Sequence, residues 1–299
     1  MAVSIVKSLC KAMESIAPLR LAEKWDNVGL LLESPIINPN ANRVLLTIDL
    51  TTAVTEEALS SRTAFIVSYH PTIFKPLPSL TLARPLQSNL LRCAASGISV
   101  YVPHTALDSV WGGINDWLGA GVGQPPEKKG PPNAEGGYKI ALIGEESPDG
   151  KGGMGRVVTL PESVSMKEME RRIKTHLGVD QIQVGYPAGK SPEDATIRSV
   201  AICAGAGDGV LLGVDADLYF TGEMPHHAVL ASVADGRFVA LCGHTNTERG
   251  YLQTLAEKLR TQIQTEAQEV TELNPSLAST LRSLDVHISK ADKHPLQIV

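Results

Sequence analysis

The sequence has few aromatic residues, no excess of basic charge and no long apolar run. Phe, Trp and Tyr make up 4% of the 299 residues, too few for the stacked aromatic platforms that bind single-stranded nucleic acid. The net charge of −5 provides no positive field for a phosphate backbone, so direct nucleic-acid binding is not expected. No apolar run approaches the roughly 20 residues that cross a bilayer, so no membrane association is expected.

Cysteine is also scarce. The four cysteines are scattered without a C-x-x-C pair, and two of them lie in apolar runs like small core residues. We therefore expect reduced thiols in the cytoplasm, with the nucleus and the mitochondrial matrix left open. No signal peptide is expected. Residues 3–16 predict an amphipathic first helix, although their basic residues also fit a mitochondrial presequence.

The most informative feature is a motif that occurs twice. An apolar, strand-like run ends in His-Thr, and an acid follows four positions after the His, as His104 with Asp108 and as His244 with Glu248. If a helix begins directly after the strand, this spacing places imidazole and carboxylate on one helical face. Such a pair is typical of a metal site.

The segments before each copy are also similar. Strand-like runs occur at 43–49 and 64–71, the second ending at His70, and again at 199–205 and 216–227, which ends at Glu223, His226 and His227. Each half thus contains a strand, a helix, a strand ending in polar side chains, further helix, and the His-Thr strand. This order predicts an α/β fold of two similar lobes, an internal duplication, with the functional groups at the strand ends.

The predicted lobe boundaries follow from composition. Residues 126–137 are rich in Gly, Pro and charge and are typical of a linker. We therefore expect a first α/β lobe at 1–125 and a second at 138–299.

A helix-capping interpretation of the repeated motif remains open. Thr245-x-x-Glu248 fits a capping box, and Thr105-x-x-Asp108 can imitate one. Capping does not account for a His directly before the Thr in both copies, or for His70 at the end of the matching strand. Imidazole and carboxylate donors without thiolates suit zinc, iron, manganese or cobalt, and carboxylates can bridge two such ions.

A turn near the N-terminus also has two interpretations. Trp25, Asp26, Asn27 and Gly29 precede an apolar run. Their residue types suit a tight bend, and the same turn also suits a position beside a functional site. Periodicity does not distinguish the two.

Five segments together resemble a known family. EKWDNVGLLLE, YHPTIF, VYVPHTALD, GHTNTERG and DKHPLQIV occur in the order seen in the Nif-three-like (Ngg-one-interacting-factor-three-like) family, known in bacteria as GTP cyclohydrolase I type 2-like. The resemblance covers nearly the whole chain. It implies two similar α/β lobes with a dinuclear centre of divalent zinc, iron or manganese between them, and a homohexameric ring built from dimers. At the matching positions the implied metal ligands are His70, His104, Asp108, His244 and Glu248.

One position departs from the bacterial pattern. Tyr69 precedes His70 where bacterial members have two adjacent histidines, and this Tyr-His form resembles the eukaryotic branch. A phenol, with a reference pKa of about 10, is a poor ligand at neutral pH unless a metal lowers that pKa. Glu223, His226 and His227 are further candidates for ligation or for the pocket.

The resemblance implies metal-assisted hydrolysis of a nucleotide or related small molecule, in which two ions lower the pKa of a bound water. The sequence identifies no catalytic residue and no guanine-reading group. The main alternative is a metal-binding regulatory protein without catalysis, a partner of transcription-related proteins as the family name implies. Metal storage or delivery is a third possibility.

Overall fold

The structure, a computed structural model, describes residues 4–124, 132–133 and 136–296, which form two compact units. Unit 1 consists of Met1–Leu107 and Tyr251–Val299, and unit 2 of Asp108–Gly250. These units differ from the predicted lobes at 1–125 and 138–299. They differ because the last strand of the chain joins the sheet of unit 1, and the helices that precede this strand belong to unit 1 as well. Most of the predicted linker, 126–137, lies outside the described residues.

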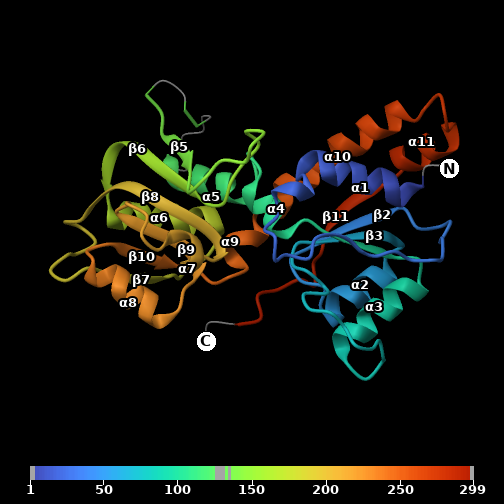
Figure 1. Cartoon of the computed structure of the whole chain (residues 1–299), viewed down its shortest axis with the longest axis horizontal. Coiled ribbons are helices and arrows are strands. Elements are labelled where there is room, and N and C mark those ends of the chain that lie inside the picture. The colour runs from blue at the N-terminus through green and yellow to red at the C-terminus, as the bar shows by residue number, and fades with distance from the viewer. Residues whose placement is uncertain (1–3, 125–131, 134–135, 297–299) are drawn as a thin grey trace. The chain divides into compact units, whose positions relative to one another are not determined.

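Unit 1 contains a five-stranded sheet (Figure 1). Its strands are β1 (Gly29–Leu32), β2 (Arg43–Thr47), β3 (Thr63–Ser68), β4 (Ser99–Val102) and β11 (Asp285–Ile288), in the order β1-β4-β3-β2-β11. Only β1 runs antiparallel to its neighbour; the other pairs are parallel. The three strands β2, β3 and β4 are nearly continuous apolar runs because helices cover both faces of a parallel sheet.

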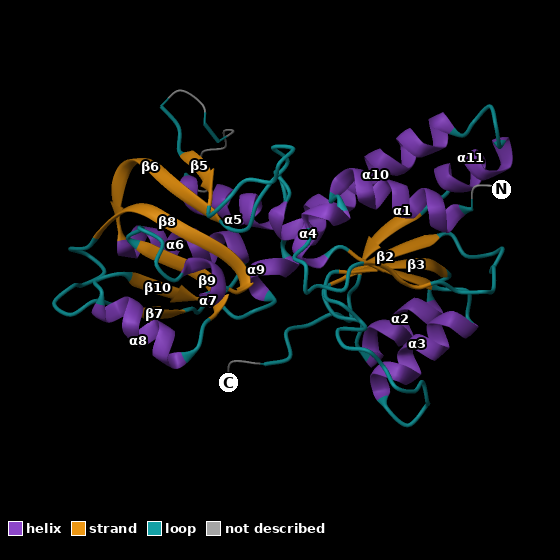
Figure 2. Ribbon diagram, viewed as in Figure 1, coloured by secondary structure: helices purple, strands orange, loops and turns teal. Residues whose placement is uncertain are grey.

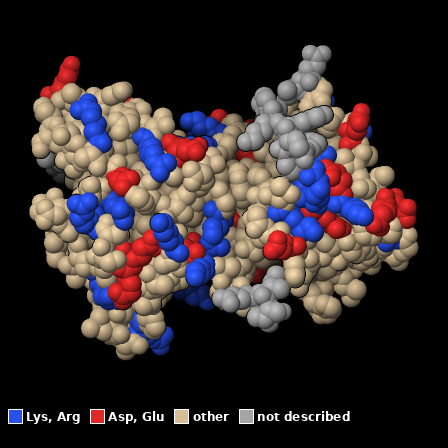
Figure 3. Space-filling model, turned by 180° about the vertical axis from the view of Figure 1, so that it is seen from behind, with Lys and Arg blue, Asp and Glu red and all other residues tan. Residues whose placement is uncertain are grey.

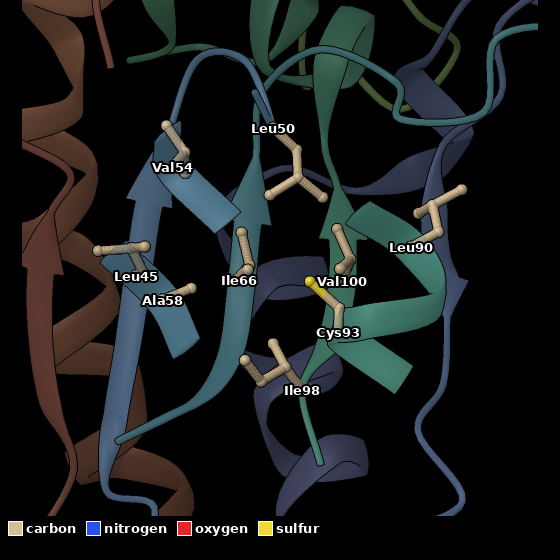
Figure 4. Close-up of a cluster of buried hydrophobic side chains, with 9 residues drawn as sticks. All are labelled: Leu45, Leu50, Val54, Ala58, Ile66, Leu90, Cys93, Ile98 and Val100. Atoms are coloured by element: carbon tan, nitrogen blue, oxygen red, sulfur yellow. The ribbon is translucent and has the colours of Figure 1, made fainter. Parts of the chain in front are cut away.

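Helices form the outer layers of unit 1 (Figure 2). One face carries α1 (Ile5–Ile16) and α10 (Tyr251–Glu269), and the other carries α2 (Thr52–Ser60) and α3 (Pro85–Ala95). The remaining helices are the 3-10 turn η1 (Leu19–Leu21), α11 (Pro275–Arg282), and α4 (His104–Ser109), which begins in unit 1. Figure 4 shows the core under α2 and α3, where Leu45, Ile66 and Val100 of the sheet face Val54 and Cys93 of the helices.

Unit 2 contains a six-stranded mixed sheet. Its strands are β5 (Lys139–Leu142), β6 (Arg156–Ser165), β7 (Gln183–Gly185), β8 (Thr196–Ala206), β9 (Leu218–Glu223) and β10 (Phe238–Leu241), in the order β5-β6-β8-β9-β10-β7. The central strands β8, β9 and β10 are parallel, and the outer pairs are antiparallel. Its helices are α5 (Ile114–Gly123), α6 (Met166–Leu177), α7 (Asp208–Leu211), α8 (His226–Ala234) and α9 (Asn246–Arg249).

Local sequence signals set both ends of α6. Ser165 caps α6 by accepting a hydrogen bond from the amide of Glu168, and Gly178 ends that helix in the left-handed region at φ 66°. A histidine on the polar side of a helix is expected to face solvent, but the ring of His176 in α6 packs 4.3 Å from that of Trp117, over the space left by Gly121.

The two units share an arrangement that bears on the site. Each has three parallel strands in chain order, β2-β3-β4 and β8-β9-β10, connected through helices. This confirms the α/β class and is consistent with the predicted duplication. The carboxyl ends of parallel strands are where α/β proteins bind ligands. His70 and His104 follow β3 and β4, Glu223 ends β9, and His244 follows β10.

Two further observations concern membrane-spanning helices and surface charge. No described helix combines the length and the apolar character needed to cross a bilayer. On the face in Figure 3, Lys and Arg side chains are interspersed with Asp and Glu side chains.

Candidate metal centre

In unit 1, two histidines lie beside a buried tyrosine. The imidazole Nδ1 of His70 lies 2.9 Å from Oδ1 of Asp49. Tyr69 is 2% exposed, and its ring centroid lies 5.0 Å from that of His70 and 5.4 Å from that of His104. The two imidazole centroids are themselves 5.5 Å apart. Tyr69 therefore packs against both predicted ligands of unit 1.

The second histidine, His104, is held by the turn whose role the sequence left open. Its Nδ1 lies 2.8 Å from the carboxylate of Asp26, which also accepts hydrogen bonds from the amide and hydroxyl of Thr105. Burial raises the pKa of the Asp26 carboxyl, but the bonds from His104 and Thr105 outweigh burial and hold that pKa below its usual value. Asp26 is therefore an anion that orients His104.

His104 also has an unusual backbone. Its φ is +30°, in a region that few residues other than glycine adopt. Strain of this kind costs on the order of 1–3 kcal/mol and tends to occur at functional sites. The contacts with Asp26 stabilise the strained conformation.

In unit 2, His244 lies between two acids. Its Nδ1 is 2.9 Å from Oε1 of Glu223, and its Nε2 is 3.2 Å from Oε1 of Glu248, whose side chain is 1% exposed. If Nδ1 donates its proton to Glu223, Nε2 presents a lone pair toward a carboxylate oxygen. Two lone-pair atoms at this distance repel each other unless a cation or a proton lies near both.

The three histidines thus have the same local arrangement. In each, Nδ1 contacts a carboxylate: Asp49 for His70, Asp26 for His104, and Glu223 for His244. Metal-binding histidines in proteins usually donate one ring N–H to such an outer acceptor, which leaves the other nitrogen to coordinate the metal. His70, His244 and Glu248 carry the donor atoms of a candidate metal-binding group.

A glycine provides space beside the donors of unit 2. Gly205, at the end of β8, has φ +64°, and a Cβ there would lie 2.8 Å both from Nε2 of His244 and from Oε1 of Glu248. Real Cβ atoms do not approach so closely, so only glycine leaves this volume open. The residues present therefore fit a bound cation. The glycine-rich segment 204–209, which overlaps the end of β8, thus leaves room at the metal-site candidate.

Comparison with known proteins identifies the family. The family model described as Duf34/NIF3 (NGG1p interacting factor 3) matches residues 4–276. This chain belongs to that family. The Schizosaccharomyces pombe "Protein NIF3 homolog" is 45% identical over 260 residues, covering 86% of this chain and 89% of the relative. The Drosophila melanogaster "NIF3-like protein 1" is 37% identical, covering 98% of this chain and 88% of the relative.

Solved structures of low sequence identity share the fold. A Bacillus cereus protein related to NIF3 has a TM-score of 0.71 at 19% identity, with 100% of both chains covered. Reduced HcgD from Methanocaldococcus jannaschii has a TM-score of 0.67 at 21% identity, covering 95% of this chain and 97% of that one. The NIF3-type fold of this chain is therefore shared with bacteria and archaea.

In this NIF3-family chain, two fully buried side chains connect the unit 2 donors to the end of β8. Thr247 accepts a hydrogen bond from the Gly205 amide (2.9 Å) and donates one to the His244 carbonyl (2.7 Å). Asn115 accepts one from the Ala204 amide (2.9 Å) and donates one to the Asp108 carbonyl (3.2 Å). The backbones that carry Asp108 and His244 are thus both tied to one two-residue segment of β8.

The residues after Asp108 are fixed by a buried arginine. Arg156 is 0% exposed, bonds the carboxylate of Asp116, and donates to the carbonyls of Ser109 and Val110 at 3.2 and 3.1 Å. The sequence pattern did not identify Arg156, Asn115 or Thr247, because each of them bonds at least one partner that is distant in the chain. The position of Arg156 directly before two valines at the start of β6 was the only signal for it.

The structure does not support the capping interpretation. Thr245 precedes α9, but its side chain caps no helical amide, and the carboxylate of Glu248 contacts His244. Thr105 lies inside α4, where its hydroxyl contacts Asp26 and the amide of Glu23. In both copies the Thr hydroxyl makes a contact that is not a helix cap, with Asp26 in the first copy and with Arg249 in the second.

The other candidates divide into two groups. Glu223 contacts His244, as a member of the site would. His226 and His227 are exposed at the start of α8, where their rings contact each other with centroids 5.4 Å apart. Their positions are set by the start of a surface helix and not by a strand end. Neither imidazole belongs to the candidate metal-binding group.

The cysteines are not suited to ligation. Cys93, Cys203 and Cys242 are buried, Cys10 is partly buried, and all four are free thiols. Burial raises the pKa of Cys203 and of Cys242 well above the usual range, so both stay protonated at neutral pH. The candidate group of His70, His244 and Glu248 accordingly offers nitrogen and oxygen donors.

Proposed function

We propose that this chain binds two divalent metal ions and uses them to hydrolyse a nucleotide or related small molecule. The proposed ligands are His70, His104, Asp108, His244 and Glu248. The first two belong to unit 1 and the others to unit 2. The proposal therefore requires both units for full metal binding.

The observation that carries the metal part is the pairing of each of the three histidines with a carboxylate through Nδ1. The close approach of His244 Nε2 to Glu248, beside the space left by Gly205, supports it independently. Zinc, iron and manganese all accept such nitrogen and oxygen donors. Bound divalent ions would supply a water of lowered pKa and polarise the bond that is broken.

The residues of the chain have positioning roles in this proposal. Asp26, Asp49 and Glu223 would orient the three imidazoles and keep their Nε2 atoms unprotonated. Tyr69, which packs against both unit 1 histidines, would restrict their rotation. No residue is assigned as the general acid or base.

Elemental analysis tests the metal part. Purified protein is expected to hold about two metals per chain, and His104→Ala and His244→Ala are each expected to hold fewer. His287→Ala is the matched control, because His287 also pairs with an acid, Asp285, but lies outside the proposed ligand set. Wild type that remains near zero metal after zinc, iron or manganese is added would overturn the proposal.

Turnover tests the hydrolytic part separately. Metal-loaded wild type is incubated with GTP and with phosphoesters, beside His244→Ala as a metal-depleted control. Product formed by wild type and lost in the variant supports hydrolysis. Full metal loading without turnover on any of these compounds would remove the hydrolytic part and leave metal binding.

A second candidate is a metal-binding regulatory protein without catalysis. The Saccharomyces cerevisiae relative, 37% identical over 273 residues, is named "NGG1-interacting factor 3". A His244→Ala variant that loses metal but keeps partner binding would favour this candidate.

The homohexameric ring of dimers is also part of the proposal, and sedimentation velocity of the metal-loaded protein tests it.

A further inference from the structure

Two exposed aromatic side chains of unit 1 lie beside the Asp26–His104 pair. Trp25 is 60% exposed and Phe74 is 54% exposed, and their ring centroids are 6.0 Å apart at an interplanar angle of 53°. The indole of Trp25 also meets the imidazole of His104 edge-on, at 6.1 Å. Large aromatic rings are usually mostly buried, so two adjacent exposed rings next to a metal-ligand candidate call for an explanation.

The backbone holds both rings in place. Asn27 donates a side-chain hydrogen bond to the Ile73 carbonyl at 2.5 Å, so the turn that carries Trp25 is tied to the loop that carries Phe74. The amide of Asn27 in turn donates to Asp26, the residue that orients His104. One three-residue turn thus displays the indole, orients the imidazole and positions the second ring.

A pocket opens beside the second ring. It has a volume of about 500 Å³ and is lined by Phe74, Leu77 and Leu86, together with Lys75 and Arg84. This size suits a small molecule. Apolar walls favour a ring, and the two basic residues favour a negatively charged substituent on it.

We propose that Trp25 and Phe74 bind the flat heteroaromatic ring of a small anionic ligand, with Lys75 and Arg84 beside its charged group. This inference rests on the proposed function, for which it specifies the substrate class. Stacking on an aromatic side chain is independent of ring identity, because every such ring has a π-face. Two aromatic side chains are enough to bind the single ring of one small ligand. The low aromatic content of the chain, which argues against a nucleic-acid platform, is therefore compatible with this proposal.

Calorimetric titration of the metal-loaded protein tests the proposal. The probes are GMP and AMP, which carry a ring, and ribose 5-phosphate, which does not. Both purine nucleotides are expected to bind wild type more tightly than ribose 5-phosphate. Trp25→Ala and Phe74→Ala are each expected to weaken purine binding by about 5- to 100-fold and to leave ribose 5-phosphate binding unchanged.

The matched control is Ile37→Ala, which removes another exposed apolar side chain of unit 1, one that is 84% exposed. It is expected to bind all three probes as wild type does. Metal content is measured for every variant, and Trp25→Ala is expected to keep its metal. Loss of purine binding with metal retained would therefore report on the ring itself.

Three results would overturn the inference. They are equal binding of GMP and ribose 5-phosphate, no purine binding by wild type, and unchanged purine affinity in Trp25→Ala. If that last variant instead changes the sedimentation coefficient, the ring pair belongs to a contact between copies of the chain. Purine binding that depends on Trp25, without turnover on any nucleotide, would support this inference while the hydrolytic part of the proposed function fails.

Discussion

A Cβ atom on Gly205 would lie 2.8 Å from Nε2 of His244. The glycine is the next-to-last residue of β8, and the histidine follows β10, which lies two strands away in the same sheet. Their approach leaves a small open volume bordered by imidazole and carboxylate atoms. The size of this volume depends on the absence of a side chain.

Gly205→Ala is expected to reduce metal binding sharply, because the methyl group would occupy this volume. Gly213→Ala is the matched control. Gly213 also has a positive φ, +85°, but a Cβ there meets no atom within 4 Å. Both variants share the backbone strain of alanine at positive φ, on the order of 1 kcal/mol. Metal titration measures the affinity. An equal loss of metal affinity in the two variants would show that backbone strain alone causes the effect.

Asp26→Asn is expected to weaken metal binding by roughly 10- to 100-fold, the usual cost of losing the acid that orients a metal-binding histidine. The amide is nearly isosteric but carries no charge, so the fold should persist. Competition with a chelator measures the affinity. Asp285→Asn, which alters the acid paired with His287 outside the proposed ligand set, should bind metal as wild type does.

Thr247→Val is expected to weaken metal binding by about 10-fold or more, since it removes the hydroxyl that joins the Gly205 amide to the His244 carbonyl. Thr247→Ser keeps that hydroxyl and should restore most of the affinity. The visible spectrum of the cobalt-substituted protein should change in the Val variant only. Thr55→Val, another fully buried threonine that bonds a carbonyl, controls for general destabilisation. A normal cobalt spectrum in Thr247→Val would contradict the positioning role.

His176 is expected to make stability depend on pH. Burial lowers its pKa from 6.5 to about 4, so the folded state binds the proton less readily than the unfolded state. The stability that the neutral ring provides is therefore fully present above pH 6.5 and declines as the pH falls from 6.5 toward 4. The decline should be on the order of 2 kcal/mol. Denaturant unfolding of wild type and His176→Phe measures it, and an identical pH dependence in the two would disprove it.

Much of the fold could be predicted from local patterns. The apolar stripe of α10, the cap and glycine stop of α6, and the buried strands each follow from neighbouring residues. The repeated His-Thr-x-x-acid motif likewise indicated His104 and His244 from spacing alone. Such signals are readable because helical and strand periodicities depend on residues a few positions apart.

The unit boundaries were not predictable in this way. The chain after Tyr251 continues directly from the second motif, yet its strand β11 pairs with β2, more than two hundred positions earlier. Pairing between distant strands depends on sheet edges and covering helices that no local window contains. Composition placed a boundary in the Gly/Pro-rich segment instead.

By itself, the sequence determined the α/β class and the main candidate ligands, because strand ends and motif spacing are local properties. Only the tertiary structure decided which residues support those ligands. Asp26 and Gly205 come from segments far in sequence from the histidines that they contact or leave room for, and Asn115 ties the Asp108 backbone to the distant strand β8. Their roles depend on hydrogen bonds and excluded volume between distant segments, and these exist only once the chain has folded.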